Sequence, residues 1–207
     1  MEEVIDGLWR EVIERFHENE RLFCDRTGCK VEPEGDRFGL SSYGQHFIVD
    51  PSSREVSAKT ELADHLLTER SSHFVPAFLH YMARIEPISV TGELLKPSNI
   101  PGGIIFVQGT HVLPLDHLAQ KYNDDSSGFL NRGASLGGMQ VGYGDVACRL
   151  SVFPKLPLTV ILGFGDDEFP PKGELYFDTS ARAALPPDVL WGIADLTVNL
   201  FLENSAE

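Results

Sequence analysis

Three consecutive acidic residues, Asp166, Asp167 and Glu168, are the part of the sequence whose residue types and spacing could most directly support chemistry. They follow an apolar segment and Gly165, and they precede Phe169 and two prolines. In an extended backbone, Asp166 and Glu168 would point to one side and Asp167 to the other, so two carboxylates could share a divalent cation or act as acid and base. The Asp-x-Asp-x-Asp-Gly spacing of calcium loops is absent, and we predict no metal site.

The same segment also has a purely structural interpretation. Asp166 and Asp167 could accept hydrogen bonds from backbone amides in a turn, Phe169 could return to the core, and Pro170-Pro171 could stiffen the exit. We favour this interpretation because Asp and Pro are common turn residues. The orientation of the three carboxylates decides between a turn and a site.

A glycine-dense stretch from Gly137 to Asp145 is the second candidate, because a backbone without side chains can approach a ligand closely. It does not match the dinucleotide-binding or P-loop templates, since it precedes a predicted strand and contains no Lys followed by Ser or Thr. Turns beside strands are the simpler interpretation. Gly138 and Asp145 remain candidate site residues.

Two of the seven histidines, His73 and His80, are spaced so that they share one face of a helix. Two ligands two turns apart cannot hold one ion unaided, because zinc bonds are only about 2 Å long. His80 and its neighbour Tyr81 are nevertheless candidates for a ligand site. The three cysteines, Cys24, Cys29 and Cys148, match no zinc or iron–sulfur spacing, and we expect free thiols of a reducing cytoplasm.

Composition narrows the possible partners and location. The chain of 207 residues has a net charge of −14, which repels phosphate backbones and anionic lipid surfaces. The acidic N-terminus lacks the features of an export signal, and no apolar run approaches the roughly 20 residues that cross a bilayer as a helix. We therefore expect a cytoplasmic protein that binds neither nucleic acid nor membrane. No motif identifies a cofactor.

The first half of the chain predicts helices around a small sheet. Apolar residues recur at helical spacing from residue 2 to 23, and the helix is expected to stop before Asp25-Arg26-Thr27-Gly28. Residues 29–57 predict an antiparallel meander with a hairpin turn at 50–53. Residues 61–84 predict helices interrupted near Ser71-Ser72.

The second half predicts a larger sheet. Residues 104–113 are ambiguous, and we favour helix. Helices are expected at 115–122 and from an Asp125 cap to Gly137, strands at 145–153, 158–164 and 174–177, and a last helix at 187–202. Because strands and helices occur in blocks, we predict an α+β single domain over 1–207, with an antiparallel or mixed sheet and amphipathic helices at the N- and C-termini.

The second half of the chain resembles a known family. The shared landmarks, in chain order, are Gly137-Gly138, Gly144-Asp145, Phe153-Pro154-Lys155-Leu156-Pro157-Leu158, the segment 165–171, Phe177-Asp178 and Leu185-Pro186. In these landmarks the chain is similar to the family called domain of unknown function 3786, most strongly over 101–207. The resemblance implies a bacterial or archaeal protein, largely of anaerobes, without an established activity. Some members look fused to cysteine-rich iron–sulfur segments, from which this chain departs.

Three functions are compatible with these observations. The first is a cytoplasmic ligand-binding or accessory protein of anaerobic prokaryotic metabolism, with a site near Gly165 to Phe169, the glycine-dense stretch, His80 and Tyr81. The second is a carboxylate-dependent enzyme, with or without a metal ion, and the third is a protein–protein interaction module. The absence of a complete catalytic constellation favours a role other than catalysis.

Overall fold

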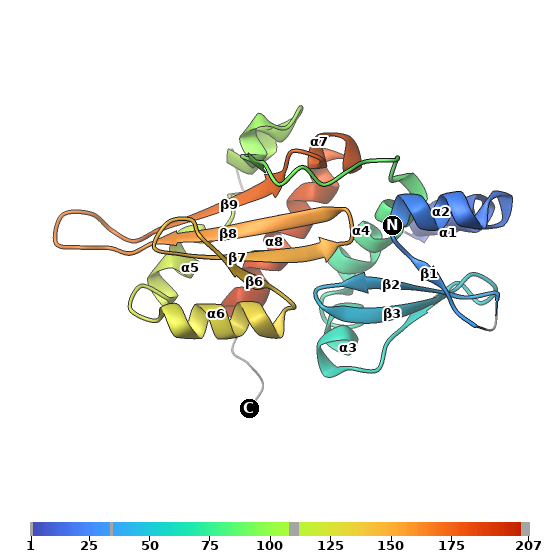
Figure 1. The fold of residues 1–207 in the computed structure, drawn as a ribbon, viewed down its shortest axis with the longest axis horizontal. Helices are drawn as coiled ribbons and strands as arrows, with labels where there is room; N and C mark the ends of the chain where they lie inside the picture. Colours follow the sequence, from blue (N-terminus) through green and yellow to red (C-terminus); the bar gives the residue numbers. More distant parts are fainter. Residues whose placement is uncertain (1, 34, 108–111, 204–207) are drawn as a thin grey trace.

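The computed structural model describes residues 2–33, 35–107 and 112–203, and these form two antiparallel sheets with helices packed around them (Figure 1). The smaller sheet has the order β1-β2-β3-β4 and the larger one β5-β9-β8-β7-β6. The strands of the smaller sheet are β1 Lys30–Val31, β2 Phe38–Ser42, β3 Gln45–Asp50 and β4 Glu55–Ser57. Those of the larger sheet are β5 Leu94–Leu95, β6 Met139–Val141, β7 Val146–Phe153, β8 Leu156–Gly163 and β9 Lys172–Asp178.

The first predicted helix is two helices, α1 Glu2–Glu18 and α2 Glu20–Thr27. Asn19 separates them, and its side-chain oxygen accepts a hydrogen bond from the Leu22 amide at 2.9 Å, which caps α2. The predicted end before Asp25 is wrong by one turn, because α2 continues to Thr27. Gly28, with φ of 75°, then closes the helix as expected.

The meander and the helices after it match the expectation closely. The turn between β3 and β4 is held by Asp50, whose Oδ1 accepts from the amides of Ser52 and Ser53. Helices α3 Glu61–Leu67 and α4 Ser71–Arg84 follow, separated just before Ser71. Of the ambiguous segment 104–113, Gly103–Val107 is the 3₁₀ helix η2, and residues 108–111 lie outside the described residues.

Strands β7 and β8 form the centre of the larger sheet, and β8 is buried from Leu156 to Leu162. Continuous burial indicates that both faces of this strand are covered. The edge strands β5 and β6 were not predicted because they are only two and three residues long. The remaining elements are η1 Pro97–Asn99, α5 Leu115–Lys121, α6 Ser126–Ser135, α7 Ala181–Ala184 and α8 Pro187–Leu202.

Helix α4 joins the N-terminal and C-terminal helices, since it packs against both α1 and α8. Helix α8 also contacts α5, α6 and η2, and Asp188 is its only exposed residue among those described. An aromatic run links the two sheets through α4. It comprises Phe47 of β3, Phe74 and Phe78 of α4, and Phe153 of β7. A separate aromatic cluster of Phe16, Phe23 and Phe38 packs α1 and α2 on β2.

A close backbone crossing joins the two sheets into one domain. The turn between β2 and β3 packs on the turn after α6, where a Cβ added to Gly44 would lie 2.7 Å from the Gly137 Cα. Both glycines have positive φ. Tyr43 in the same turn donates its amide to the Ser151 carbonyl, and its hydroxyl lies 2.7 Å from the Thr197 hydroxyl of α8. The predicted α+β single domain is confirmed.

No helix within the described part of the chain combines the length and the apolar character that a bilayer span needs.

Candidate functional site

The acidic segment lies in the loop of residues 164–171 that joins β8 to β9 and projects from one end of the molecule (Figure 1). Its backbone turns at Asp166 and does not continue as extended chain. The Asp166 carboxylate accepts hydrogen bonds from the amides of Glu168 and Phe169, both at 2.8 Å, and its own amide donates to the Phe169 carbonyl. These bonds stabilise the ionised form and hold the pKa of Asp166 below its usual value.

The other two carboxylates of the segment have a different environment. Asp167 and Glu168 are exposed, and within the described residues neither side chain forms a hydrogen bond or an ion pair. The three acids therefore do not converge on one point. Asp166 holds the turn, whereas Asp167 and Glu168 present negative charge to solvent.

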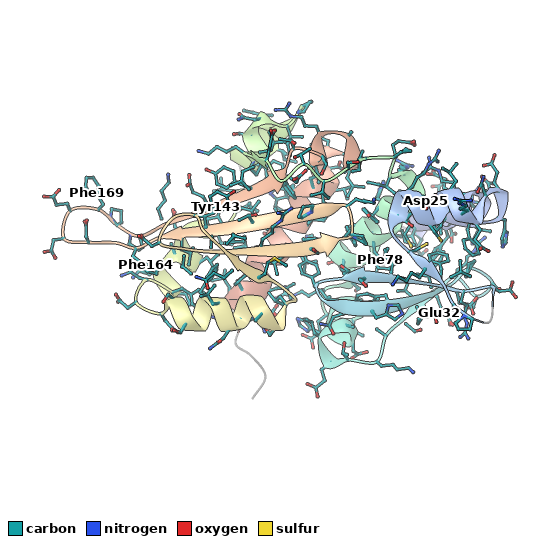
Figure 2. The ribbon with its side chains drawn as sticks, in the orientation of Figure 1. Asp25, Glu32, Phe78, Tyr143, Phe164 and Phe169 are labelled. Atoms are coloured by element: carbon teal, nitrogen blue, oxygen red, sulfur yellow. The ribbon has the colours of Figure 1, made fainter. Side chains whose placement is uncertain are left out.

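Phe169 does not return to the core, and this expectation is wrong. Its side chain is 67% exposed, and Phe164 at the other side of the loop is 36% exposed. The loop extends beyond the sheet, so no second layer reaches Phe169. Tyr143, between β6 and β7, is a further exposed aromatic residue at 43%, and the three lie toward the same end of the molecule (Figure 2).

The base of the loop is fixed by contacts with neighbouring turns. The Phe164 amide donates to the Asp145 carboxylate at 2.7 Å, and the Gly165 amide donates to the Asn123 side-chain oxygen at 2.7 Å. A Cβ on Gly165 would lie 2.7 Å from Pro171 Cδ, so the two ends of the loop lie close together. Asn123 was missed by the sequence reasoning, although the run Asn123-Asp124-Asp125 marks a turn.

His80 and Tyr81 lie away from the acidic loop. The Tyr81 hydroxyl donates to the Thr27 carbonyl at 2.9 Å and accepts from the Lys155 amide at 3.1 Å, just before β8 begins. The loop follows the other end of this eight-residue strand, which is about 26 Å long. Tyr81 is fully buried and stacks on Phe153, so it acts as a structural link between α2, α4 and the β7–β8 turn.

His80 lines a separate surface pocket between α4 and α8, of about 210 Å³, together with His73, Asp188 and Trp191. The Nδ1 atom of His80 is buried and has no hydrogen-bond partner within the described residues. Burial lowers the pKa of His80, as does the charge of Arg84. The neutral imidazole is therefore favoured in the folded protein.

Gly138 belongs to the packing of the larger sheet. A Cβ at this position would lie 2.5 Å from the Cys148 Sγ and 2.8 Å from the Gly133 carbonyl oxygen. The absence of a side chain thus lets α6 pack on β7. Of the predicted site residues, the structure brings together Asp145 and the segment from Gly165 to Phe169, and it leaves Gly138, His80 and Tyr81 elsewhere.

A larger cavity, of about 390 Å³, opens where α1, α2 and α4 meet. Its floor includes Phe23 and Met82, and its polar lining includes Arg15, Arg26 and Glu18. No acceptor in the described part of the chain lies within hydrogen-bonding distance of the buried Arg26 Nε. This cavity is not predictable from apolar spacing, because that spacing favours a continuous helix through Asn19, where α1 and α2 separate.

The described residues contain no group of three His, Cys, Asp or Glu side chains that could hold a metal ion.

Comparison with known proteins gives a family without an activity. No curated protein and no solved structure matches the chain. The family described as "Domain of unknown function (DUF3786)" matches residues 22–200, which include both sheets and nearly all of α8. The chain therefore belongs to the DUF3786 family.

Proposed function

We propose that the protein is a cytoplasmic accessory protein of anaerobic prokaryotic metabolism that binds a partner protein through the β8–β9 loop. The observation that supports the proposal is the exposure of Phe164 and Phe169 on a turn held in one conformation by Asp166. Aromatic side chains dominate binding energy at protein interfaces, and a preformed turn has little conformational entropy to lose on binding.

The chemistry of the loop defines the partner surface that would fit it. Phe169 needs an apolar pocket, and the exposed carboxylates of Asp167 and Glu168 beside it need basic groups around that pocket. The net charge of −14 adds a long-range attraction toward a basic partner. The partner is therefore a protein with an apolar pocket and a Lys- or Arg-rich rim.

Site-specific photocrosslinking tests this proposal. A photoreactive phenylalanine analogue at position 169 should give a discrete crosslinked species in cells of the native host, and the same analogue at position 4 should not. Val4 is a suitable control because it is also well exposed, but on α1. The partner protein identified in the crosslinked species is then purified, and its Kd for the unmodified chain is measured.

Phe169→Ala should raise the Kd for that purified partner by roughly tenfold to a hundredfold, because it removes a buried aromatic anchor. Val4→Ala should leave the Kd unchanged. Asp167→Asn with Glu168→Gln should mainly slow association and reduce its dependence on salt. Equal Kd values for the wild type and the Phe169→Ala variant would refute a docking role of the loop.

Binding of a small organic anion is a second candidate function, favoured by the cavity between α1, α2 and α4. Two arginines, Arg15 and Arg26, line this cavity in a strongly acidic chain. Arg15 already donates to Glu86 and to the Ile85 carbonyl, whereas the buried Nε of Arg26 has no acceptor among the residues that the structure describes. A carboxylate can receive two parallel hydrogen bonds from one guanidinium, which a turn of the Arg26 side chain into the cavity would provide.

A thermal-shift screen with mono-, di- and tricarboxylates and with phosphate tests this second function. A true ligand at a hundred times its Kd should raise Tm by about 5–10 °C in a protein of this size. Arg26→Gln should abolish the shift, and Arg21→Gln, at an exposed position of the same helix, should preserve it. The second function is excluded if the shift survives Arg26→Gln or if no anion produces one.

A further inference from the structure

Cys24 and Cys29 form a close pair of thiols, with their Sγ atoms 2.9 Å apart. Neither thiol is in a disulfide. Cys24 is in the last turn of α2, and Cys29 comes directly before β1. A disulfide bond is about 2.05 Å long, so the sulfur atoms need to approach by only about 0.9 Å to form one.

The end of α2 produces this proximity. Gly28 adopts the left-handed conformation, and its amide donates to the Cys24 carbonyl at 2.8 Å. The chain therefore reverses over the last turn and returns residue 29 to the side of residue 24. A side chain at position 28 would be strained for two reasons, because φ is 75° and a Cβ would lie 2.7 Å from Pro154 Cβ.

Further hydrogen bonds hold the pair in place. The Thr27 hydroxyl accepts from the Cys29 amide and donates to the Phe23 carbonyl, and the Thr27 carbonyl accepts from Tyr81. On the other side, Lys30 pairs with Gly39 of β2. Both cysteines are thus attached to fixed elements, and their separation is a property of the fold.

We propose that Cys24 and Cys29 are a reversible oxidation site that a low-molecular-weight disulfide converts into an intramolecular disulfide. The Cys24 thiolate attacks one sulfur of the oxidant, forms a mixed disulfide and releases one thiolate. The Cys29 thiol then loses its proton and attacks Cys24 Sγ, which releases the second thiolate. The protein loses two electrons and two protons, and the oxidant becomes two thiols.

Exposure assigns these roles. Cys24 is half-buried and can meet an oxidant, whereas Cys29 is only 5% exposed and serves as the resolving thiol. Cys148 is buried against α6 and lies in β7, outside the pair. Burial raises the pKa of Cys24 and of Cys29, so the exchange is slow at neutral pH and accelerates as pH rises.

Oxidation of the purified full chain with oxidised glutathione tests the proposal. Thiol titration under denaturing conditions should show three thiols falling to one, and the mass should fall by about 2 Da as two hydrogens are lost. Without reduction, trypsin should release 22–26 and 27–30 as one linked peptide pair, because it cleaves after Arg21, Arg26 and Lys30. Dithiothreitol should restore all three thiols.

Matched variants make the outcome decisive. Cys148→Ser should still lose both remaining thiols, whereas Cys29→Ser should stop at a glutathione adduct on Cys24. A wild-type protein that keeps stable glutathione adducts, links Cys148 or retains three thiols above pH 8 would overturn the proposal. The same titration on Gly28→Ala, if folded by circular dichroism, should show a disulfide yield reduced at least severalfold.

Discussion

Asp178 at the end of β9 provides the sharpest test of how this fold is held together. Asp178 is 4% exposed, and its carboxylate accepts hydrogen bonds from the Thr91 amide and hydroxyl, the Gly92 amide and the Ser180 amide. The shortest is 2.6 Å, from Gly92. One buried charge therefore fixes the segment before β5 and the start of the turn before α7.

Asp178→Asn keeps the shape of the side chain but removes the charge and turns one acceptor into a donor. The amide of Thr91 or Gly92 then loses its acceptor, at a partly buried position. A hydrogen bond to a charged group contributes about 1.5–3 kcal/mol. Thr91 and Gly92 are exposed residues, so water can reach the amide that is left without an acceptor and its further cost is small. The expected loss in the free energy of unfolding at pH 7 is about 1.5–3 kcal/mol.

The difference between wild type and Asp178→Asn should depend on pH with a defined sign. Burial raises the pKa of Asp178, but the hydrogen bonds from Ser180, Thr91 and Gly92 outweigh it, and the pKa lies below its usual value. A lowered folded-state pKa gives stability that is complete above the unfolded pKa of about 3.9 and is lost as pH falls through the folded pKa. The advantage of the wild type should therefore be constant from pH 7 to 5 and decline below pH 4.

Urea unfolding followed by circular dichroism at pH 7, 5 and 3.5 measures both quantities. Asp167→Asn is the matched control, because its carboxylate is exposed and has no partner among the described residues. It should unfold like the wild type. The free energy of unfolding of Asp178→Asn could instead fall by less than about 0.5 kcal/mol at pH 7, or fall equally at pH 7 and pH 3.5. Either result would show that the hydrogen bonds to the Asp178 carboxylate do not stabilise the fold.

Three further predictions concern other parts of the molecule. Gly44→Ala should lower the free energy of unfolding in urea by about 2–4 kcal/mol, because of backbone strain and the clash with Gly137. Gly35→Ala is the control, because Gly35 also has positive φ but open space around it, and it should lower this free energy by only about 1–2 kcal/mol. Tyr81→Phe should lower the free energy of unfolding by about 1–3 kcal/mol because two buried backbone groups lose their partner, and an unchanged unfolding midpoint would contradict the linking role. Asp166→Asn should increase amide hydrogen exchange at residues 168 and 169 with little change in Tm, and unchanged exchange would show that the carboxylate does not hold the turn.

The elements of this fold were predictable where the local pattern is long. The helix at 187–202, the hairpin of β7 and β8, and the meander were all predicted from apolar spacing and turn residues. Strands β5 and β6 were not, because a pairing of two or three residues depends on the neighbouring strand and leaves no period in the sequence. Asn19 is a residue type that commonly caps helices, but the apolar spacing continues on both sides of it and favours one unbroken helix.

The candidate site was predictable in composition but not in geometry. An Asp before a turn indicates a side chain that caps backbone amides, and Asp166 does so. The position of Phe169 could not be read from its type, since an aromatic residue after a strand is more often buried. The separation of His80 and Tyr81 from the acidic loop follows from the placement of α4 against the far end of β8, which only the tertiary structure shows.

The packing of α8 has a consequence for how the chain is made. The elements that α8 contacts most extensively among the described residues, α4, α5, α6 and η2, precede it in the chain. During synthesis at about 5–20 residues per second, the face of α4 that packs on α8 therefore stays uncovered for roughly 6–24 s. The chain can form its small N-terminal sheet early, but its core closes only after residues 187–202 have left the ribosome. Nascent chains should consequently be the form of this protein that most needs protection from aggregation.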